Sequence, residues 1–157
     1  MADPNQWGSL VWKILHIQSE HLGKQKIQML KNDERILINK FLKQINYILP
    51  CSICKKHYND YYMNNSSNSI EYNDINTFLI NYFYNLHNSV NERNNKILFA
   101  KEDLIIYKKY TKQEYSILLK EFEQLFKKVY AIHYYISIDA INDFLMTIRK
   151  LRQITGF

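Results

Sequence analysis

Residues 49–58 read Leu49-Pro50-Cys51-Ser52-Ile53-Cys54-Lys55-Lys56-His57-Tyr58. A proline disfavours helical geometry in the residue before it and favours the first turn of a helix that follows it. One helix is therefore expected to end at Pro50, and the next is expected to begin with the pair Cys51 and Cys54. The stretch predicts that a dithiol opens a helix.

Amphipathic patterns on both sides of this stretch predict further helices. Residues 7–22 carry an apolar stripe at helical spacing. Residues 24–48 carry another, in which the polar pair Asn32 and Asp33 marks a candidate break. After the dithiol, the Asn- and Ser-rich residues 63–72 favour a loop. Asn73 or Asp74 is then expected to cap a fourth helix with a wide apolar face.

The last third of the chain is also expected to be helical. Residues 100–110 predict a short fifth helix, and Thr111-Lys112-Gln113-Glu114 has the form of a capping box that starts another. The predicted inward residues of that helix are Leu118, Phe122, Leu125, Phe126, Val129 and His133. Ser137 or Asp139 is expected to cap a last helix. No segment shows sustained two-residue alternation, so the predicted fold class is all-α.

The composition is that of one globular domain. The chain has 157 residues, of which 46% are hydrophobic and 23% charged, and its three Gly and two Pro favour long helices. The net charge is +6, but Lys and Arg are spread along the chain, which argues against a nucleic-acid partner. Residues 1–6 lack a secretory signal pattern, and no apolar run approaches the ~20 residues that span a bilayer. We expect a soluble protein with no membrane span.

The chemistry of the chain is expected to lie in its two cysteines. A pair this close in sequence cannot join distant parts of a fold. At a helix N-terminus, free amides and the helix dipole stabilise a thiolate, and Lys55 and Lys56 would add to that effect. A thioredoxin-like site would need a strand before the pair, and haem attachment would need His directly after Cys54. Neither requirement is met.

Zinc binding stays open as an alternative. Cys51, Cys54, His57 and His87 supply two sulfurs and two imidazoles, which is a zinc ligand set, although the spacing is loose for a zinc finger. On this hypothesis the chain is a non-catalytic interaction module. Trp7, His21 and His133 are interpreted as structural residues.

Three blocks of the sequence, in order, are similar to one family. They are Trp7-Gly8-x-x-x-Trp12-x-x-Leu15-His16, then Leu49-Pro50-Cys51-x-x-Cys54-x-x-His57, then Leu86-His87-Asn88-x-Val90-Asn91-x-x-x-x-Lys96. Their order and separation resemble the Erv/ALR family of FAD-linked sulfhydryl oxidases. Among the members of this family, the chain most resembles the compact ones from large cytoplasmic DNA viruses.

The resemblance implies a four-helix bundle that holds FAD at one end, with a short fifth helix against it. Residues 1–110 would form this domain, and the apolar stripes of residues 111–157 predict a helical extension packed on the domain or at a subunit interface. Cys51 and Cys54 would be the catalytic pair, with Cys54 beside the flavin and Cys51 as the outer sulfur. The implied cofactor-binding residues are Gly8, Trp12, His16, His57, His87, Asn88, Val90, Asn91, Lys96 and Tyr107.

The same resemblance implies a thiol oxidase that forms disulfide bonds in protein dithiols. A substrate dithiol would attack Cys51, and the electrons would pass through Cys54 and FAD to dioxygen, with hydrogen peroxide as the product. Because the chain has no second cysteine pair, a separate dithiol protein, such as a thioredoxin-like relay, must reach Cys51 directly. A homodimer is expected, located in the host cytoplasm, with the virion as a second location.

Overall fold

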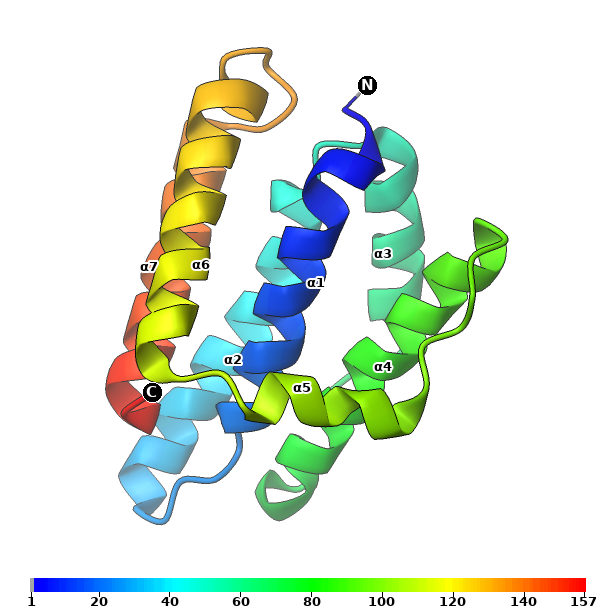
Figure 1. Ribbon diagram of the computed structural model, residues 1–157. Helices are drawn as coiled ribbons and strands as arrows, with labels where there is room; N and C mark the ends of the chain where they lie inside the picture. Colours follow the sequence, from blue (N-terminus) through cyan, green and yellow to red (C-terminus); the bar gives the residue numbers. More distant parts are fainter. Residues whose placement is uncertain (1) are drawn as a thin grey trace.

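The computed structural model describes residues 2–157, and among these residues every regular element is helical (Figure 1). The all-α fold class is therefore confirmed. No helix of the described residues is long and apolar enough to cross a membrane. The main helices are α1 (Pro4–His21), α2 (Gln28–Ile48), α3 (Ser52–Asn64), α4 (Ile75–Arg93), α5 (Ile105–Lys108), α6 (Lys112–Leu125) and α7 (Ile138–Thr155).

Helices α1 to α4 form the bundle that was expected, with α1 packed on α4 and α2 packed on α3. Their apolar stripes meet in the centre, where Ile17, Phe41 and Phe83 are fully buried. The expected short fifth helix is present as a 3-10 turn, η2 (Lys101–Leu104), followed by α5. It crosses one end of the bundle and packs on α1.

The first turn of α3 begins where the sequence predicts it, at the cysteine pair. Cys51 is the N-cap residue, with extended backbone geometry, and the helix begins at Ser52. The Cys54 N–H donates to Cys51 Sγ at 3.2 Å, and the Lys55 N–H donates to the Cys51 carbonyl oxygen at 2.9 Å. The prediction that the dithiol opens a helix is confirmed.

The predicted break at Asn32 and Asp33 is wrong. Both residues lie within the continuous helix α2, on its exposed face, so their polarity reflects contact with water rather than a turn. The chain turns earlier, at Gly23, whose φ of +74° favours glycine. The buried carboxylate of Glu34 accepts the Gly23 N–H at 2.9 Å and the Tyr72 hydroxyl, which fixes this turn against α2.

Helices α6 and α7 return along the bundle, with α6 on α1 and α7 on α2. The capping box of Thr111 and Glu114 is confirmed, because both of its reciprocal hydrogen bonds form. Residues Phe126–Ala131 form a π-helical segment, η3, whose wider turn shifts the helix face by one residue. Tyr130 is therefore buried, whereas Val129 and His133, which were predicted to face inward, are exposed.

Candidate active site

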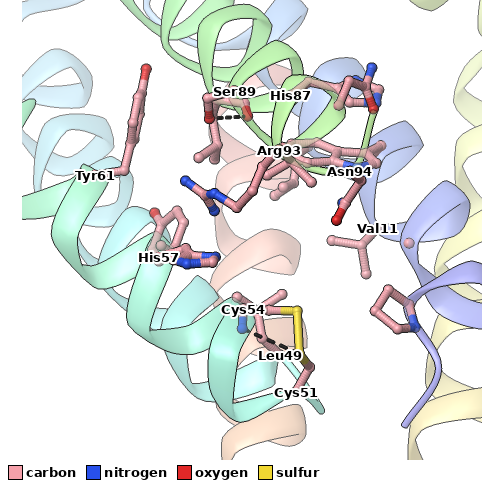
Figure 2. Close-up of a pocket in the computed structure, with 18 of the residues that line it drawn as sticks. Val11, Leu49, Cys51, Cys54, His57, Tyr61, His87, Ser89, Arg93 and Asn94 are labelled. Atoms are coloured by element: carbon pink, nitrogen blue, oxygen red, sulfur yellow. Dashed lines mark hydrogen bonds between the residues drawn. A yellow bond between two sulfur atoms is a disulfide. The ribbon is translucent and has the colours of Figure 1, made fainter. Parts of the chain in front are cut away.

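The two cysteines are joined as a disulfide at the N-terminus of α3. Cys51 is only 4% exposed, and Cys54 is partly exposed. Figure 2 shows Cys54 on the side of the disulfide that faces a cavity and Cys51 on the side away from it. The first turn of the helix therefore turns the Cys54 sulfur toward the middle of the cavity and places the Cys51 sulfur at its edge.

The cavity beside the disulfide has a volume of about 880 Å³ and lies between α1, α3 and the second half of α4. That volume is in the range of sites that hold cofactors. Both cysteines line it. The other predicted site residues along its wall are Gly8, Trp12, His57, His87, Val90, Asn91, Lys96 and Tyr107.

Trp12 and His87 form an aromatic wall of this cavity. Their rings stack with centroids 4.1 Å apart and planes inclined by 10°. Behind them, His16 is buried and stacks on Tyr107 at 4.5 Å. His16 Nε2 and His87 Nδ1 are 3.0 Å apart, so one ring donates its N–H to the other. His16 does not line the cavity; the structure places it where it orients the ring of His87.

Both members of this histidine pair are held neutral. Burial, and then the neighbouring His87, lower the pKa of His16 to about 3. Burial, and then the charge of Lys96, lower the pKa of His87 to about 4. A proton on the accepting ring nitrogen would break the hydrogen bond between the two rings.

We expect the free energy of unfolding to fall as the pH drops from about 6.5 toward 4, because the unfolded chain takes up protons at its histidines before the folded protein does. The contribution of the neutral histidine pair to the free energy of unfolding is fully present above about pH 6.5. Urea unfolding at about pH 7 and about pH 5 measures the difference. His16→Gln should weaken the pH dependence, and His133→Gln, at an exposed position, should not. Equal pH dependence in the wild type and His16→Gln would contradict the assignment.

Asn88 also lies outside the lining of the cavity. Its side-chain amide donates to the carbonyl oxygen of Phe99 at 3.0 Å, and its side-chain oxygen accepts the Phe99 N–H at 2.8 Å. These two hydrogen bonds hold the segment after α4 against the helix. Phe99 is thereby placed against the ring of His87, with centroids 5.7 Å apart.

Replacing Asn88 with alanine is expected to lower the free energy of unfolding by about 1–3 kcal/mol, because two partly buried backbone groups of Phe99 lose their partners. Urea denaturation measures this loss. Asn85→Ala is the matched control, since Asn85 is an exposed asparagine of the same helix. If both variants lost the same stability, Asn88 would have no special role.

The end of α4 places two cations at the cavity. Asn95 adopts a φ of +53°, which asparagine tolerates, and this reverses the chain so that the Lys96 N–H donates to the Asn91 carbonyl oxygen at 2.8 Å. Lys96 Nζ then donates to Asn5 Oδ1 at 3.1 Å.

The second cation is Arg93. Figure 2 shows Arg93 extending into the cavity toward the side where His57 lies. Burial, and then the charge of Arg93, lower the pKa of His57.

Arg93 is a site residue that the sequence reasoning missed. The helical spacing contained the signal, because Leu86, Val90 and Arg93 follow each other at intervals of four and three residues and therefore share one face of α4. All three line the cavity. Tyr61 of α3, another missed residue, lines the opposite wall and donates its hydroxyl to the Tyr82 carbonyl oxygen at 2.9 Å.

The structure does not group the four candidate zinc ligands. Within residues 2–157, no three or more His, Cys, Asp or Glu side chains are grouped so that they could hold a metal ion. Cys51 and Cys54 are bonded to each other, and His87 directs Nδ1 to His16 rather than to a sulfur. The four proposed ligands therefore do not form a zinc site.

Fold and site together define a class: a helical redox protein whose reactive disulfide borders a cavity suited to a large ligand. Comparison with known proteins gives the family. The profile of the Erv1 / Alr family matches residues 9–116, which is more than half of the sequence. The chain belongs to the Erv1/Alr family.

One relative comes from Invertebrate iridescent virus 3 and is described as "Putative FAD-linked sulfhydryl oxidase 096R". It is 31% identical to this chain over 94 residues. The match spans 60% of this chain and 60% of the viral protein. No solved structure matches the chain significantly.

Proposed function

We propose that this protein is an FAD-dependent thiol oxidase that forms disulfide bonds in protein dithiols. One observation carries the proposal: a disulfide at a helix N-terminus turns its Cys54 side toward a cavity of about 880 Å³. Membership of the Erv1/Alr family and the description of the viral relative support it.

The residues around the cavity fit FAD in size and in chemistry. The stacked rings of Trp12 and His87 offer a flat surface for a ring system. Lys96 and Arg93 supply positive charge for a pyrophosphate, which must be bound by side chains because the chain has no glycine-rich phosphate loop. Gly8 leaves open space at the wall, since a Cβ there would meet no atom within 4 Å. Gly8, His57, Val90, Asn91 and Tyr107 are the other residues proposed to hold FAD.

The chemistry of the chain itself is thiol–disulfide exchange. A substrate thiolate attacks Cys51 Sγ, the Cys51–Cys54 bond breaks, and Cys54 leaves as a thiolate on the cavity side. The second substrate thiol then attacks the mixed disulfide, which releases oxidised substrate and the Cys51 thiolate. The substrate dithiol has lost two electrons and two protons; the cysteine pair has gained the two electrons, and the protons pass to solvent or to the cysteine thiolates.

The helix geometry supports the two roles of the sulfurs. Amides of the first turn of α3 stabilise negative charge at the pair, and the Cys54 N–H already donates to Cys51 Sγ at 3.2 Å. Bound FAD would supply the acceptor for the two electrons of the reduced pair and the route to dioxygen, with hydrogen peroxide as the product.

An absorbance spectrum and an oxygen electrode test this function. The purified protein should be yellow, with flavin bound without a covalent bond, and it should consume oxygen when dithiothreitol is added. Heat denaturation should release the flavin into solution. A folded protein that binds no added FAD, or a flavoprotein that leaves dithiothreitol reduced, would refute the proposal.

We further propose a homodimer and a location in the host cytoplasm and the virion. The expectation of a dimer comes from the family, and that of the location from the viral relative. The protein substrate, a thioredoxin-like relay being one candidate, is likewise a proposal. Sedimentation equilibrium measures the oligomeric state. Tagged expression in cells tests the location, and import into mitochondria or the endoplasmic reticulum would contradict it.

A further inference from the structure

The position of Cys51 sets a requirement for any protein substrate. Under the proposed function a substrate thiolate attacks Cys51, yet this residue is only 4% exposed. Cys54 faces the cavity that the cofactor would fill. The substrate cysteine must therefore reach the small exposed part of Cys51, and this favours a partner that is held by contacts beyond the cysteines themselves.

An apolar surface projects where the chain turns from η3 into α7. We call residues 129–138 the tip. Exposed apolar side chains are concentrated there: Ile132 is 63% exposed, Tyr134 95% and Ile138 52%. Tyr134 also has a φ of +59°, a left-handed geometry that is uncommon for an aromatic residue and is often kept where it serves a function. Apolar groups gathered on a small domain usually mark a binding surface.

The tip lies at the end of the bundle that carries the disulfide. Figure 1 shows it at the same end as the first turn of α1 and the start of α3. Asp3, the N-cap residue of α1, is close enough to Tyr130 to contribute, after burial, to its raised pKa. Two more exposed apolar residues flank the cysteines in sequence, Tyr47 at 50% and Ile53 at 55% exposure. Exposed apolar side chains from three segments therefore lie at the end of the bundle that carries the disulfide.

We propose that the tip, together with Tyr47 and Ile53, is the docking surface for the protein that brings the substrate dithiol. Its occupant is a polypeptide segment in which aliphatic or aromatic side chains flank the reacting cysteine. Burial of those side chains against Ile132 and Tyr134 holds the segment while its thiol enters at Cys51. A second copy of this chain is disfavoured as the occupant, because it would stand over the start of α3 and block the substrate.

The test uses the full-length, FAD-loaded protein and two synthetic dithiol peptides, each with a central Cys-Gly-Gly-Cys. One peptide has Leu and Phe on either side of the cysteines, and the other has Ser. The wild type should oxidise the Leu/Phe peptide with a kcat/KM about tenfold higher. The double variant Ile132→Ser and Tyr134→Ser should lose that preference and still oxidise dithiothreitol at the wild-type rate.

Ile117→Ser is the matched control, since Ile117 is 51% exposed near the start of α6, at the opposite end of the bundle. It should keep the preference for the Leu/Phe peptide. Equal rates for both peptides in the wild type, or a preference that survives in the double variant, would overturn the docking surface. A double variant that changes from dimer to monomer would also overturn it, because the tip would then be a subunit interface.

Two further results keep the test decisive. If the double variant does not fold, Tyr134→Ser alone gives the measurement, because a side chain that is 95% exposed contributes little to the core. If the wild type does not oxidise dithiothreitol, the proposed function fails by itself, independently of the peptide comparison.

Discussion

Replacing either Cys51 or Cys54 with serine is expected to abolish thiol oxidation, with a loss of at least about 10³-fold in kcat. Each variant removes one sulfur of the disulfide at the start of α3, and the chain holds no other cysteine that could replace it. A single thiol can form a mixed disulfide with a substrate, but it cannot release an oxidised product. Oxygen consumption with dithiothreitol measures the loss.

The two variants should differ in their absorbance. Cys54 lies on the cavity side of the disulfide, so Cys51→Ser leaves a thiolate facing the bound flavin. That variant should show a long-wavelength band from the thiolate and the flavin together, and Cys54→Ser should not. Ser52→Ala, an exposed change between the cysteines, is the matched control and should keep full activity. The opposite pattern of bands would exchange the roles of the two sulfurs.

Removing residues 111–157 is expected to prevent stable folding. Helix α7 packs along α2, and the ring of Phe144 lies 5.6 Å from the ring of Phe41 in the bundle core. Burying five side chains of the extension contributes roughly 8–15 kcal/mol. That sum is comparable with the roughly 5–15 kcal/mol that stabilises a whole domain. The five residues, each no more than 1% exposed, are Phe122, Ile141, Phe144, Ile148 and Leu151.

The truncation also leaves a polar atom of the bundle without its partner. The Tyr115 hydroxyl donates to the buried Gln18 Oε1 at 2.6 Å, and this bond is lost with α6. Chain 1–110 should therefore be insoluble, or should show no cooperative unfolding by circular dichroism. In the full chain, Phe144→Ala should cost about 3–5 kcal/mol, and Met146→Ala, 44% exposed on the same helix, should cost far less. A soluble, flavin-binding fragment that unfolds cooperatively would show that residues 1–110 fold independently.

Much of the fold could be predicted because the apolar residues of an amphipathic helix recur at a regular spacing in the sequence. The start of α3, the capping box at Thr111 and the Ser137 cap of α7 follow from neighbouring residues alone. Errors arose where the packing of the folded chain differs from what this spacing predicts. Periodicity placed Val129 inward, but the π-helical segment that contains it rotates the face and buries Tyr130. Polarity suggested a break at Asn32, but the residue lies on the exposed side of α2.

The sequence by itself determined that the dithiol caps a helix, because proline geometry and helix capping act over four or five residues of chain. It also placed His87 and Asn91 on one helix face, since that depends only on the helical repeat. Only the tertiary structure decided that His16 turns to His87, that Asn88 holds Phe99, and that α7 covers α2. These contacts join segments from different helices and loops, and helical periodicity gives the face of a side chain but not the partner that the packed chain brings to it.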